Sequence, residues 1–123
     1  MRKRSLPGQS NEQLVGYFIE IAVAQEYEQS YGSIAKYSRL FHQMQALVSE
    51  LKSRTGDQRR LLIDLHKHEN WHVRYKAAKA TLAVAPVESR QLLERIAASN
   101  HFPEAGEAGM TLVALDRGIY KPT

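Results

Sequence analysis

The 123-residue sequence contains no cysteine and has only four prolines and one tryptophan. Without cysteine the chain forms neither disulfide bonds nor thiolate metal sites, which is typical of a protein in the reducing cytoplasm. Its apolar runs are too short to cross a bilayer. No segment alternates apolar and polar residues over the length that a half-buried strand needs. These absences predict an all-helical, cytoplasmic chain with no membrane partner.

The sequence also lacks the short motifs that mark common catalytic sites. It has no nucleophile elbow, no glycine-rich loop for phosphate and no carboxylate pair with an obvious cleft. We therefore expect a protein that is not an enzyme, has no cofactor and takes no small-molecule substrate.

Histidines gather at one polar turn. His66, His68, Glu69 and His72 lie close together in the sequence, and the four-residue spacing of His68 and His72 is one by which two imidazoles share a helix face. Asn70 is expected to start a helix between them, which interrupts that face, and zinc needs further ligands, for which only Glu69, His42 or His101 are candidates. We interpret the cluster as an exposed turn and predict no metal site.

Positive charge is concentrated in the middle of the chain. The net charge is +4, yet residues 31–79 carry ten Lys and Arg against four acidic residues, whereas residues 11–30 carry only four acidic residues. Such a distribution can present a basic surface to an acidic partner. Solvated faces whose charges partly pair with each other explain the same pattern.

The most informative feature that is present is a repeat of about 31 residues between residues 58 and 115. Each copy has an apolar pair, a polar turn, an aromatic residue and a second helical segment. The matching pairs are Leu61 with Leu92, Leu62 with Leu93, Leu65 with Ile96 and Trp71 with Phe102. A repeat of this length, built from two helices and a turn, predicts an α-solenoid.

Periodicity and capping residues predict about six helices in three antiparallel hairpins. We expect a flexible N-terminal arm over 1–10, a single domain over 11–118 and a C-terminal tail over 119–123. The expected helices span 11–30, 33–54, 57–67 and 71–84, followed by one that starts at Pro86 and one that starts at Pro103. The expected caps are Asn11, Ser33, Asp57 and Asn70.

The apolar faces of the first two helices are predicted from the 3.6-residue period. In the first helix the expected core stripe is Leu14, Val15, Phe18, Ile19, Ala22 and Val23, with Tyr17 on the opposite face. In the second helix the expected seam is Ile34, Tyr37, Phe41, Met44, Val48 and Leu51, reinforced by Leu40 and Leu47.

The fourth predicted helix resembles the first helix of a HEAT-like repeat. The pattern is carried by Asn70, Val73, Arg74, the pair Ala77–Ala78 and Leu82, and the next helix contributes Leu92, Leu93 and Ile96. The resemblance implies that Arg74 pairs with an acid, for which Asp64 and Glu69 are candidates. Trp71 and Phe102 are expected to pack between helical layers. The second copy departs from the pattern, as a terminal cap would.

The whole chain, from about Gln13 to Pro122, is also similar to a small bacterial family of unassigned function. The stretches that carry this resemblance are residues 55–59, 73–86, 105–110 and 115–118. The resemblance implies an all-helical, HEAT-like fold and brings no activity with it.

Two functions remain open at this point. The first is a protein-interaction module that binds one unidentified protein partner or another copy of itself. The alternative is a nucleic-acid-backbone binder that uses a basic ridge on the middle helices. The candidate binding surface for either consists of Arg59, Arg60, Lys67, His72, Tyr75, Lys76 and Lys79.

Overall fold

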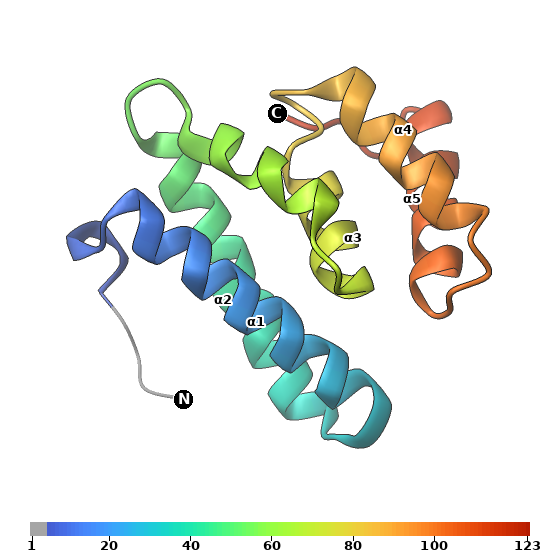
Figure 1. The fold of residues 1–123 in the computed structure, drawn as a ribbon, viewed down its shortest axis with the longest axis horizontal. Helices are drawn as coiled ribbons and strands as arrows, with labels where there is room; N and C mark the ends of the chain where they lie inside the picture. Colours follow the sequence, from blue (N-terminus) through green and yellow to red (C-terminus); the bar gives the residue numbers. More distant parts are fainter. Residues whose placement is uncertain (1–4) are drawn as a thin grey trace. The chain divides into compact units, whose positions relative to one another are not determined.

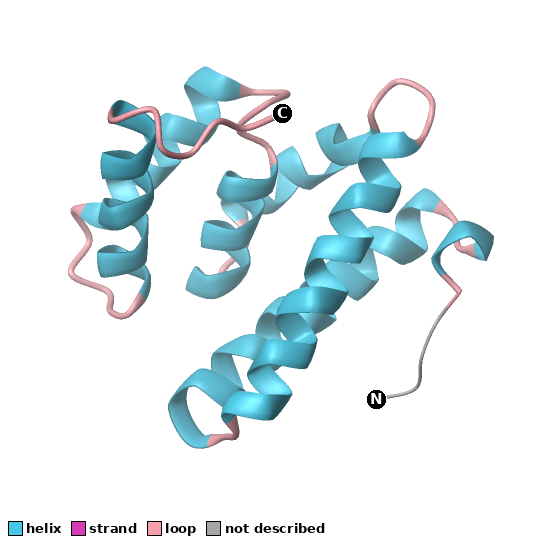
Figure 2. Cartoon of the chain, turned by 180° about the vertical axis from the view of Figure 1, so that it is seen from behind, coloured by secondary structure: helices cyan, strands magenta, loops and turns pink. Residues whose placement is uncertain are grey.

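A computed structural model describes residues 5–123, and every regular element in this range is helical (Figures 1 and 2). In chain order the elements are η1 (Leu6–Gly8), α1 (Asn11–Tyr31), α2 (Ile34–Ser53), η2 (Gln58–Lys67), α3 (Trp71–Ala80), α4 (Pro86–Ala97) and α5 (Glu104–Asp116), where η marks a 3-10 helix. The expected all-helical class is confirmed for these residues. Of the expected arm over 1–10, residues 1–4 lie outside the described range. None of the described helices has the length and apolar content needed to cross a membrane.

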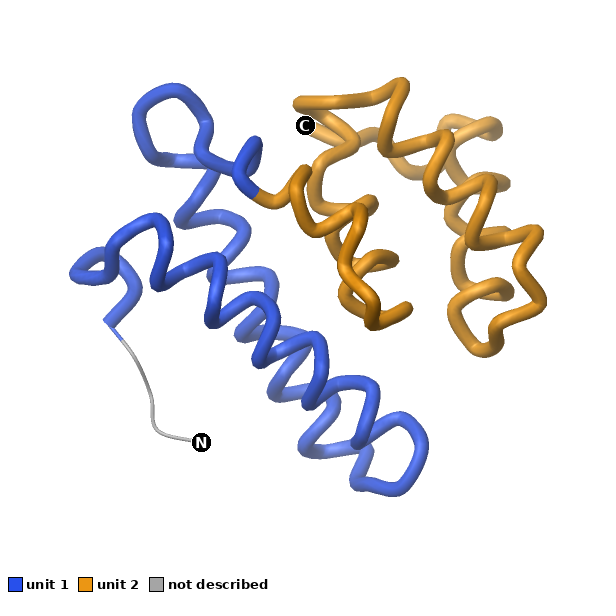
Figure 3. The backbone as a smooth tube through the Cα atoms, viewed as in Figure 1, with its two compact units in different colours: residues 1–61 blue, residues 62–123 orange. Residues whose placement is uncertain are grey.

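The chain divides into two compact units, residues 1–61 and residues 62–123 (Figure 3). The boundary falls within η2. Each unit is described below by itself, and the single domain expected over 11–118 stays a prediction.

Unit 1 is built on the antiparallel hairpin of α1 and α2 (Figure 1). A capping box starts α1, because the Ser10 hydroxyl accepts the Gln13 amide (3.1 Å) and the Gln13 side chain accepts the Ser10 amide (2.7 Å). The N-cap of α1 is therefore Ser10, and the prediction that Asn11 caps this helix is wrong. Ser33 caps α2 as predicted, since its hydroxyl accepts the Lys36 amide at 3.2 Å.

The core of unit 1 differs from the predicted faces. The fully buried side chains include Leu14, Phe18, Ile21, Leu47 and Leu51. On α1, Tyr17 is buried and Val23 is exposed, which reverses the predicted assignment of both residues. On α2, Ile34 and Phe41 are exposed, and the buried line is Leu40, Met44, Leu47 and Leu51. In both helices the buried face is therefore rotated from the predicted one. The prediction was wrong because apolar residues cover a wide arc of each helix, and the sequence does not show which part of that arc faces the core.

Arg54 fastens the open end of the hairpin. Its Nη1 donates to the Asn11 side chain (2.9 Å), its Nη2 to the Leu6 carbonyl (3.0 Å) and its Nε to the Glu50 carboxylate (3.0 Å). One guanidinium therefore joins η1, the start of α1 and the end of α2.

The third predicted helix is η2, a 3-10 helix rather than an α-helix. Arg59, Leu62 and Leu65 are buried, whereas Leu61 is 36% exposed. The buried positions recur every three residues, which is the period of a 3-10 helix and brings all three side chains onto one face. An α-helix would have turned these positions apart.

Unit 2 contains α3, α4 and α5, which pack against one another. Asn70 caps α3 as predicted, because its side-chain oxygen accepts the Val73 amide at 3.0 Å. The buried cluster at the centre is Tyr75, Ala78, Leu82, Leu92, Leu93, Ile96 and Ala108. After α5, Gly118 adopts a positive φ of 69° and the chain folds back, so that Tyr120 packs on this cluster.

Candidate functional site

The first part of the predicted binding surface is only partly exposed. Arg59 is 7% exposed and is held by Asp57, whose Oδ1 accepts from Nε (2.9 Å) and whose Oδ2 accepts from Nη2 (2.7 Å). This hydrogen-bonded pairing lowers the pKa of Asp57 below its usual value. Arg60 and Lys67 are exposed. The structure thus removes Arg59 from the predicted surface.

Two further members of the predicted surface are core residues. His72 is fully buried, and its Nδ1 lies 3.1 Å from Oε2 of Glu104, which is 1% exposed. Tyr75 is 3% exposed and shares a hydrogen bond of 3.1 Å with the Thr111 hydroxyl. Both contacts join α3 to α5. Both residues were predicted to be exposed because they have polar groups. No local sequence pattern indicates their hydrogen-bond partners, which lie more than 30 positions away in the chain.

Lys76 and Lys79 are half-buried beside tyrosine rings. The Lys76 ammonium lies 5.7 Å from the Tyr75 ring centre, and the Lys79 ammonium lies 5.6 Å from the Tyr120 ring centre. Burial and, to a smaller extent, the charge of Lys79 lower the pKa of Lys76 to about 8, and Glu107 opposes this shift. These two lysines therefore do not extend into solvent as a ridge of fully exposed cations would.

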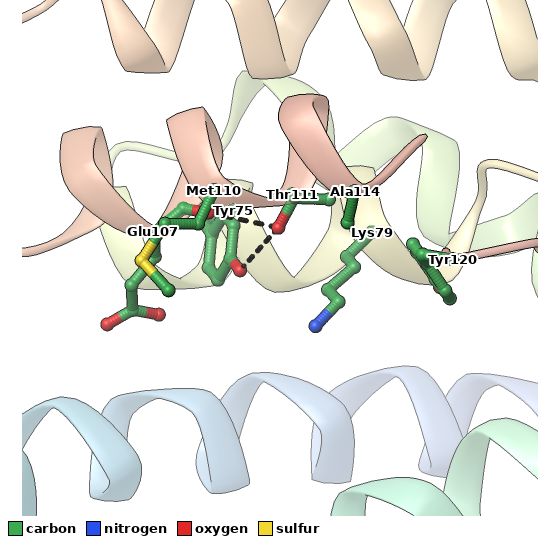
Figure 4. Close-up of a pocket in the computed structure, with 7 residues that line it drawn as sticks. All are labelled: Tyr75, Lys79, Glu107, Met110, Thr111, Ala114 and Tyr120. Carbon is green, nitrogen blue, oxygen red and sulfur yellow. Dashed lines mark hydrogen bonds between the residues drawn. The ribbon is translucent and has the colours of Figure 1, made fainter. Parts of the chain in front are cut away.

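A pocket of about 250 Å³ lies between α3, α5 and the C-terminal segment (Figure 4). Its lining residues are Tyr75, Lys79, Glu107, Met110, Thr111, Ala114 and Tyr120. Figure 4 shows the Tyr75 ring between the carboxylate of Glu107 and the ammonium of Lys79. One acid and one base at opposite ends of an aromatic wall provide no concentrated charge for binding a polyanion.

The structural repeat positions are mostly in the core. The buried ones are Val73, Ala77, Ala78, Leu82, Leu92, Leu93 and Ile96. Trp71 is partly buried against this core, but Phe102 is 68% exposed, so the predicted equivalence of the two aromatic residues in packing is wrong. Trp71 instead stacks on His101 at 4.6 Å between ring centres.

Arg74 makes a contact other than the predicted one. Its guanidinium carbon lies 4.1 Å from the centre of the Trp71 ring, and neither Asp64 nor Glu69 pairs with it among the ion pairs of residues 5–123. Its Nε is buried without a hydrogen-bond partner there. Arg74 therefore makes a cation–π contact with Trp71, where the HEAT-like resemblance implied an ion pair with an acidic residue.

The histidines of the polar turn face separate partners. His66 lies 2.9 Å from the Thr81 hydroxyl, which in turn lies 2.7 Å from the Ser89 hydroxyl. Burial lowers the pKa of His66. His68 accepts the Asn70 amide at 3.0 Å, and His72 turns into the core toward Glu104. Each of these three imidazoles therefore contacts a different residue: His66 contacts Thr81, His68 contacts Asn70 and His72 contacts Glu104.

The structure exposes an apolar surface that the sequence analysis did not select. Phe102, Met110 and Val113 are 68%, 73% and 50% exposed. Gly106, Met110 and Val113 recur at steps of four and three residues and so lie on one face of α5, and Phe102 precedes the helix beside Gly106; we call these four residues the α5 stripe. A Cβ added at Gly106 would lie 3.8 Å from the Phe102 ring. The lack of any charged residue from Ala108 to Leu115 was the sequence signal for this face.

A second apolar surface lies at the closed end of the α1–α2 hairpin. Tyr27, Tyr31 and Ile34 are 60%, 81% and 91% exposed, and we call these three residues the hairpin tip. The two tyrosine rings contact each other, with 5.5 Å between their centres. The prediction that Ile34 is in the core is wrong; it rests on the spacing from Tyr37 and Phe41, which fits a heptad.

Comparison with known proteins places the chain without naming an activity. No functionally curated protein shows significant similarity to it. The chain is similar to a solved structure, the crystal structure of the protein RPA1889 from Rhodopseudomonas palustris CGA009, with 44% sequence identity and a TM-score of 0.93 over 98% of this chain and 100% of that one. Residues 12–116 match the family described as Domain of unknown function (DUF2019), and the chain belongs to that family.

Proposed function

We propose that this protein is a non-enzymatic protein-interaction module of HEAT-like type that docks a protein partner on the α5 stripe. The observation that carries the proposal is the exposure of Met110 and Val113 on one face of α5 and of Phe102 just before that helix. Contiguous exposed apolar side chains mark interaction sites in proteins, whereas single ones are ordinary.

The composition of α5 supports this use of the stripe. The helix faces the core with Ala105, Ala108 and Thr111, all buried. A helix on the surface of a protein ordinarily carries charged residues on the opposite face, but α5 has its acids only at its two ends, at Glu104, Glu107 and Asp116. An apolar outer face at this position favours a covering partner.

The stripe allows a partner to approach closely. An added Cβ at Gly109 would meet no atom within 4 Å, and one at Gly106 would meet only the Phe102 ring. Fully burying a Phe, Met or Val side chain is worth about 1.5–3 kcal/mol each. A stable interface buries about 800 Å² on each partner, which is more than three side chains supply. The partner therefore also contacts the neighbouring pocket, which shares Met110 with the stripe.

The HEAT-like element of the proposal is supported by α3 and α4. Both helices bury the positions that the repeat pattern assigns to the core, among them Val73, Ala77, Leu92 and Leu93. Repeat proteins of this kind act by presenting surfaces to partners rather than by chemistry. The resemblance and the exposed stripe point to the same mode of action.

Nucleic-acid binding is the weaker proposal. Of the seven residues selected for it, Arg59, His72 and Tyr75 are buried, and the ammonium groups of Lys76 and Lys79 lie beside tyrosine rings. Affinity for a phosphate backbone scales with the number of cations that reach it. Arg60 and Lys67 are then the main exposed cations of the ridge.

Site-specific photo-crosslinking in cells tests the proposal. A photoreactive phenylalanine analogue replaces Met110 in one variant and Glu94, an exposed residue of α4, in the control. We expect a discrete adduct from position 110 that is absent from position 94. Equal labelling at both positions, or none at position 110, contradicts the proposal.

A further inference from the structure

We propose that the hairpin tip binds a second copy of this chain, with the acidic α1 of each copy facing the basic first half of α2 in the other. This inference concerns unit 1 and goes beyond the proposed function, which rests on α5 in unit 2. Each proposal stands or fails without the other.

The tip is an ordered surface rather than a loose loop. The Glu28 carboxylate accepts the Ser33 amide at 2.9 Å, and its side chain covers Gly32 so closely that a Cβ there would collide with it. The Ser33 hydroxyl in turn caps α2. Only two residues, Gly32 and Ser33, separate the helices. Tyr27, Tyr31 and Ile34 are therefore presented at fixed positions, and a binding partner need not order the loop.

The exposed side chains are of the kind that anchor interfaces. Tyrosine offers a large contact area at a low entropic cost and is enriched at interaction hot spots. Ile34 is 91% exposed at the first turn of α2, where a polar residue would leave the fold unchanged. Three large apolar side chains at one end of a hairpin make a patch whose exposure only a partner relieves.

The charges of the hairpin favour a second copy as the occupant. Helix α1 carries Glu12, Glu20, Glu26 and Glu28 with no Lys or Arg, whereas residues 29–49 carry Lys36 and Arg39 with no acid. Lys36 and Arg39 form no ion pair with any residue in the range 5–123. An interface related by a two-fold axis brings α1 of one copy against α2 of the other twice, so both opposite-charge contacts form.

The placement of these charges along the helices supports the same arrangement. Glu28 lies in the last turn of α1 and Lys36 in the first turn of α2. The Glu28 carboxylate accepts the Ser33 amide within its own chain, whereas Lys36 is at the end of α2 whose dipole disfavours a positive charge. Acidic groups from a second copy offset the placement of Lys36. A partner with charges of one sign would complement only one of the two helices.

Charge-swap variants of the full chain test the inference. One variant carries Lys36→Glu and Arg39→Glu, and the other carries Glu20→Lys and Glu26→Lys. A matched control, Arg117→Glu with Lys121→Glu, changes as much charge at exposed positions of unit 2. Masses are measured by light scattering after size exclusion, at concentrations up to about 100 μM so that a dimer with a micromolar Kd is populated. Circular dichroism confirms that each variant is folded.

We expect the wild type and the control to have twice the 14.0 kDa mass of one chain. Each charge-swap variant alone is expected at the single-chain mass, since α1 and α2 of its two copies then repel. A mixture of the two variants is expected to recover the double mass, because every α1–α2 contact is again between opposite charges. Tyr31→Glu with Ile34→Glu is expected to give a monomer that no mixture rescues.

Three results would overturn the inference. They are a wild type that stays monomeric over the whole concentration range, a dimer that survives the charge swaps and Tyr31→Glu with Ile34→Glu, and a dimer that only Met110→Glu separates. The last result would place self-association on the α5 stripe instead.

Discussion

The buried imidazole of His72 lies 3.1 Å from the carboxylate of Glu104 and joins the start of α3 to the start of α5. Both side chains are almost fully removed from solvent. The contact spans 32 positions of the sequence and connects the first and last α-helices of unit 2. It holds in place the helix whose outer face is the α5 stripe.

Breaking this pair is expected to destabilise the protein strongly. His72→Ala leaves the Glu104 carboxylate buried without its imidazole partner, and removing one member of a buried pair costs about 3–5 kcal/mol. Glu94→Ala, in an exposed pair with Arg90, serves as the control and should lie within about 1 kcal/mol of wild type. Urea unfolding curves measure both changes. A loss of stability in His72→Ala no larger than in the control contradicts this role.

The same pair predicts how stability depends on pH. Burial by itself raises the pKa of Glu104, but hydrogen bonds from His72 and from the backbone, with the nearby imidazoles, outweigh it and leave the pKa below the usual 4.5. The unfolded chain then binds the proton more readily, so the stabilisation is complete above about pH 4.5 and is lost as the pH falls through the lower, folded-state pKa.

Glu104→Gln tests this dependence. We expect the wild type to be more stable than the variant at neutral pH, and the difference to shrink progressively below about pH 4.5 as the wild-type carboxylate is protonated. Thermal unfolding from pH 7 down to pH 3 measures it. A difference that stays constant or grows on acidification would show that the charge of Glu104 is not stabilising.

Arg54 is expected to be the main polar support of unit 1. Arg54→Ala removes hydrogen bonds to Asn11, Leu6 and Glu50, two of them across the open end of the hairpin. A hydrogen bond that involves a charged group contributes about 1.5–3 kcal/mol, and we expect Arg54→Ala to lower the free energy of unfolding by about that amount. Arg60→Ala, at an exposed position, should change stability by less than about 0.5 kcal/mol. Chemical unfolding that gives the two variants equal stability argues against the assignment.

The core of unit 2 offers a packing test. Leu93 is fully buried, and Leu93→Ala is expected to cost about 2–5 kcal/mol. Met110→Ala removes a side chain that is 73% exposed and should be close to neutral. Differential scanning calorimetry compares the two. Similar losses would mean that the α5 stripe is packed against the protein rather than exposed.

Binding to a labelled DNA and RNA of mixed sequence separates the two proposed functions. Because three of the seven ridge residues are buried, we expect no salt-sensitive binding at about 50 mM salt, where contacts with phosphates are strong. Binding that weakens steeply with salt, and that Arg60→Glu with Lys67→Glu abolishes, would favour the nucleic-acid proposal instead.

The helices could be predicted from the sequence, but their facing could not. Caps and breakers such as Ser33, Asn70 and Pro86 act locally, so most helix limits are predicted to within a few residues. The burial of Tyr17 and the exposure of Ile34 depend on which side of each helix meets its neighbour, and both helices are apolar over wide arcs. The 3-10 geometry of η2 was not predicted, since Leu61, Leu62 and Leu65 fit one face of an α-helix, whereas the buried residues Arg59, Leu62 and Leu65 follow the three-residue period.

The site was harder to predict than the fold. Polar side chains are expected to be exposed, yet His72, Tyr75 and Arg59 are buried because Glu104, Thr111 and Asp57 supply their hydrogen bonds. Two of those partners lie more than 30 positions away, and no local pattern connects them. The exposure of Met110 and Val113 was not predicted, because the repeat pattern does not show which side of α5 faces solvent.

The native mass of the tagged chain in an extract of its own cells shows whether a partner occupies the α5 stripe. We predict that the wild type elutes above the mass of the purified chain. Met110→Asp with Val113→Asp should return it to the purified mass. Val87→Asp, at a valine of α4 that is 67% exposed, should leave the complex intact. A wild type that elutes at the purified mass, or a complex that Met110→Asp with Val113→Asp leaves unchanged, contradicts docking on the α5 stripe.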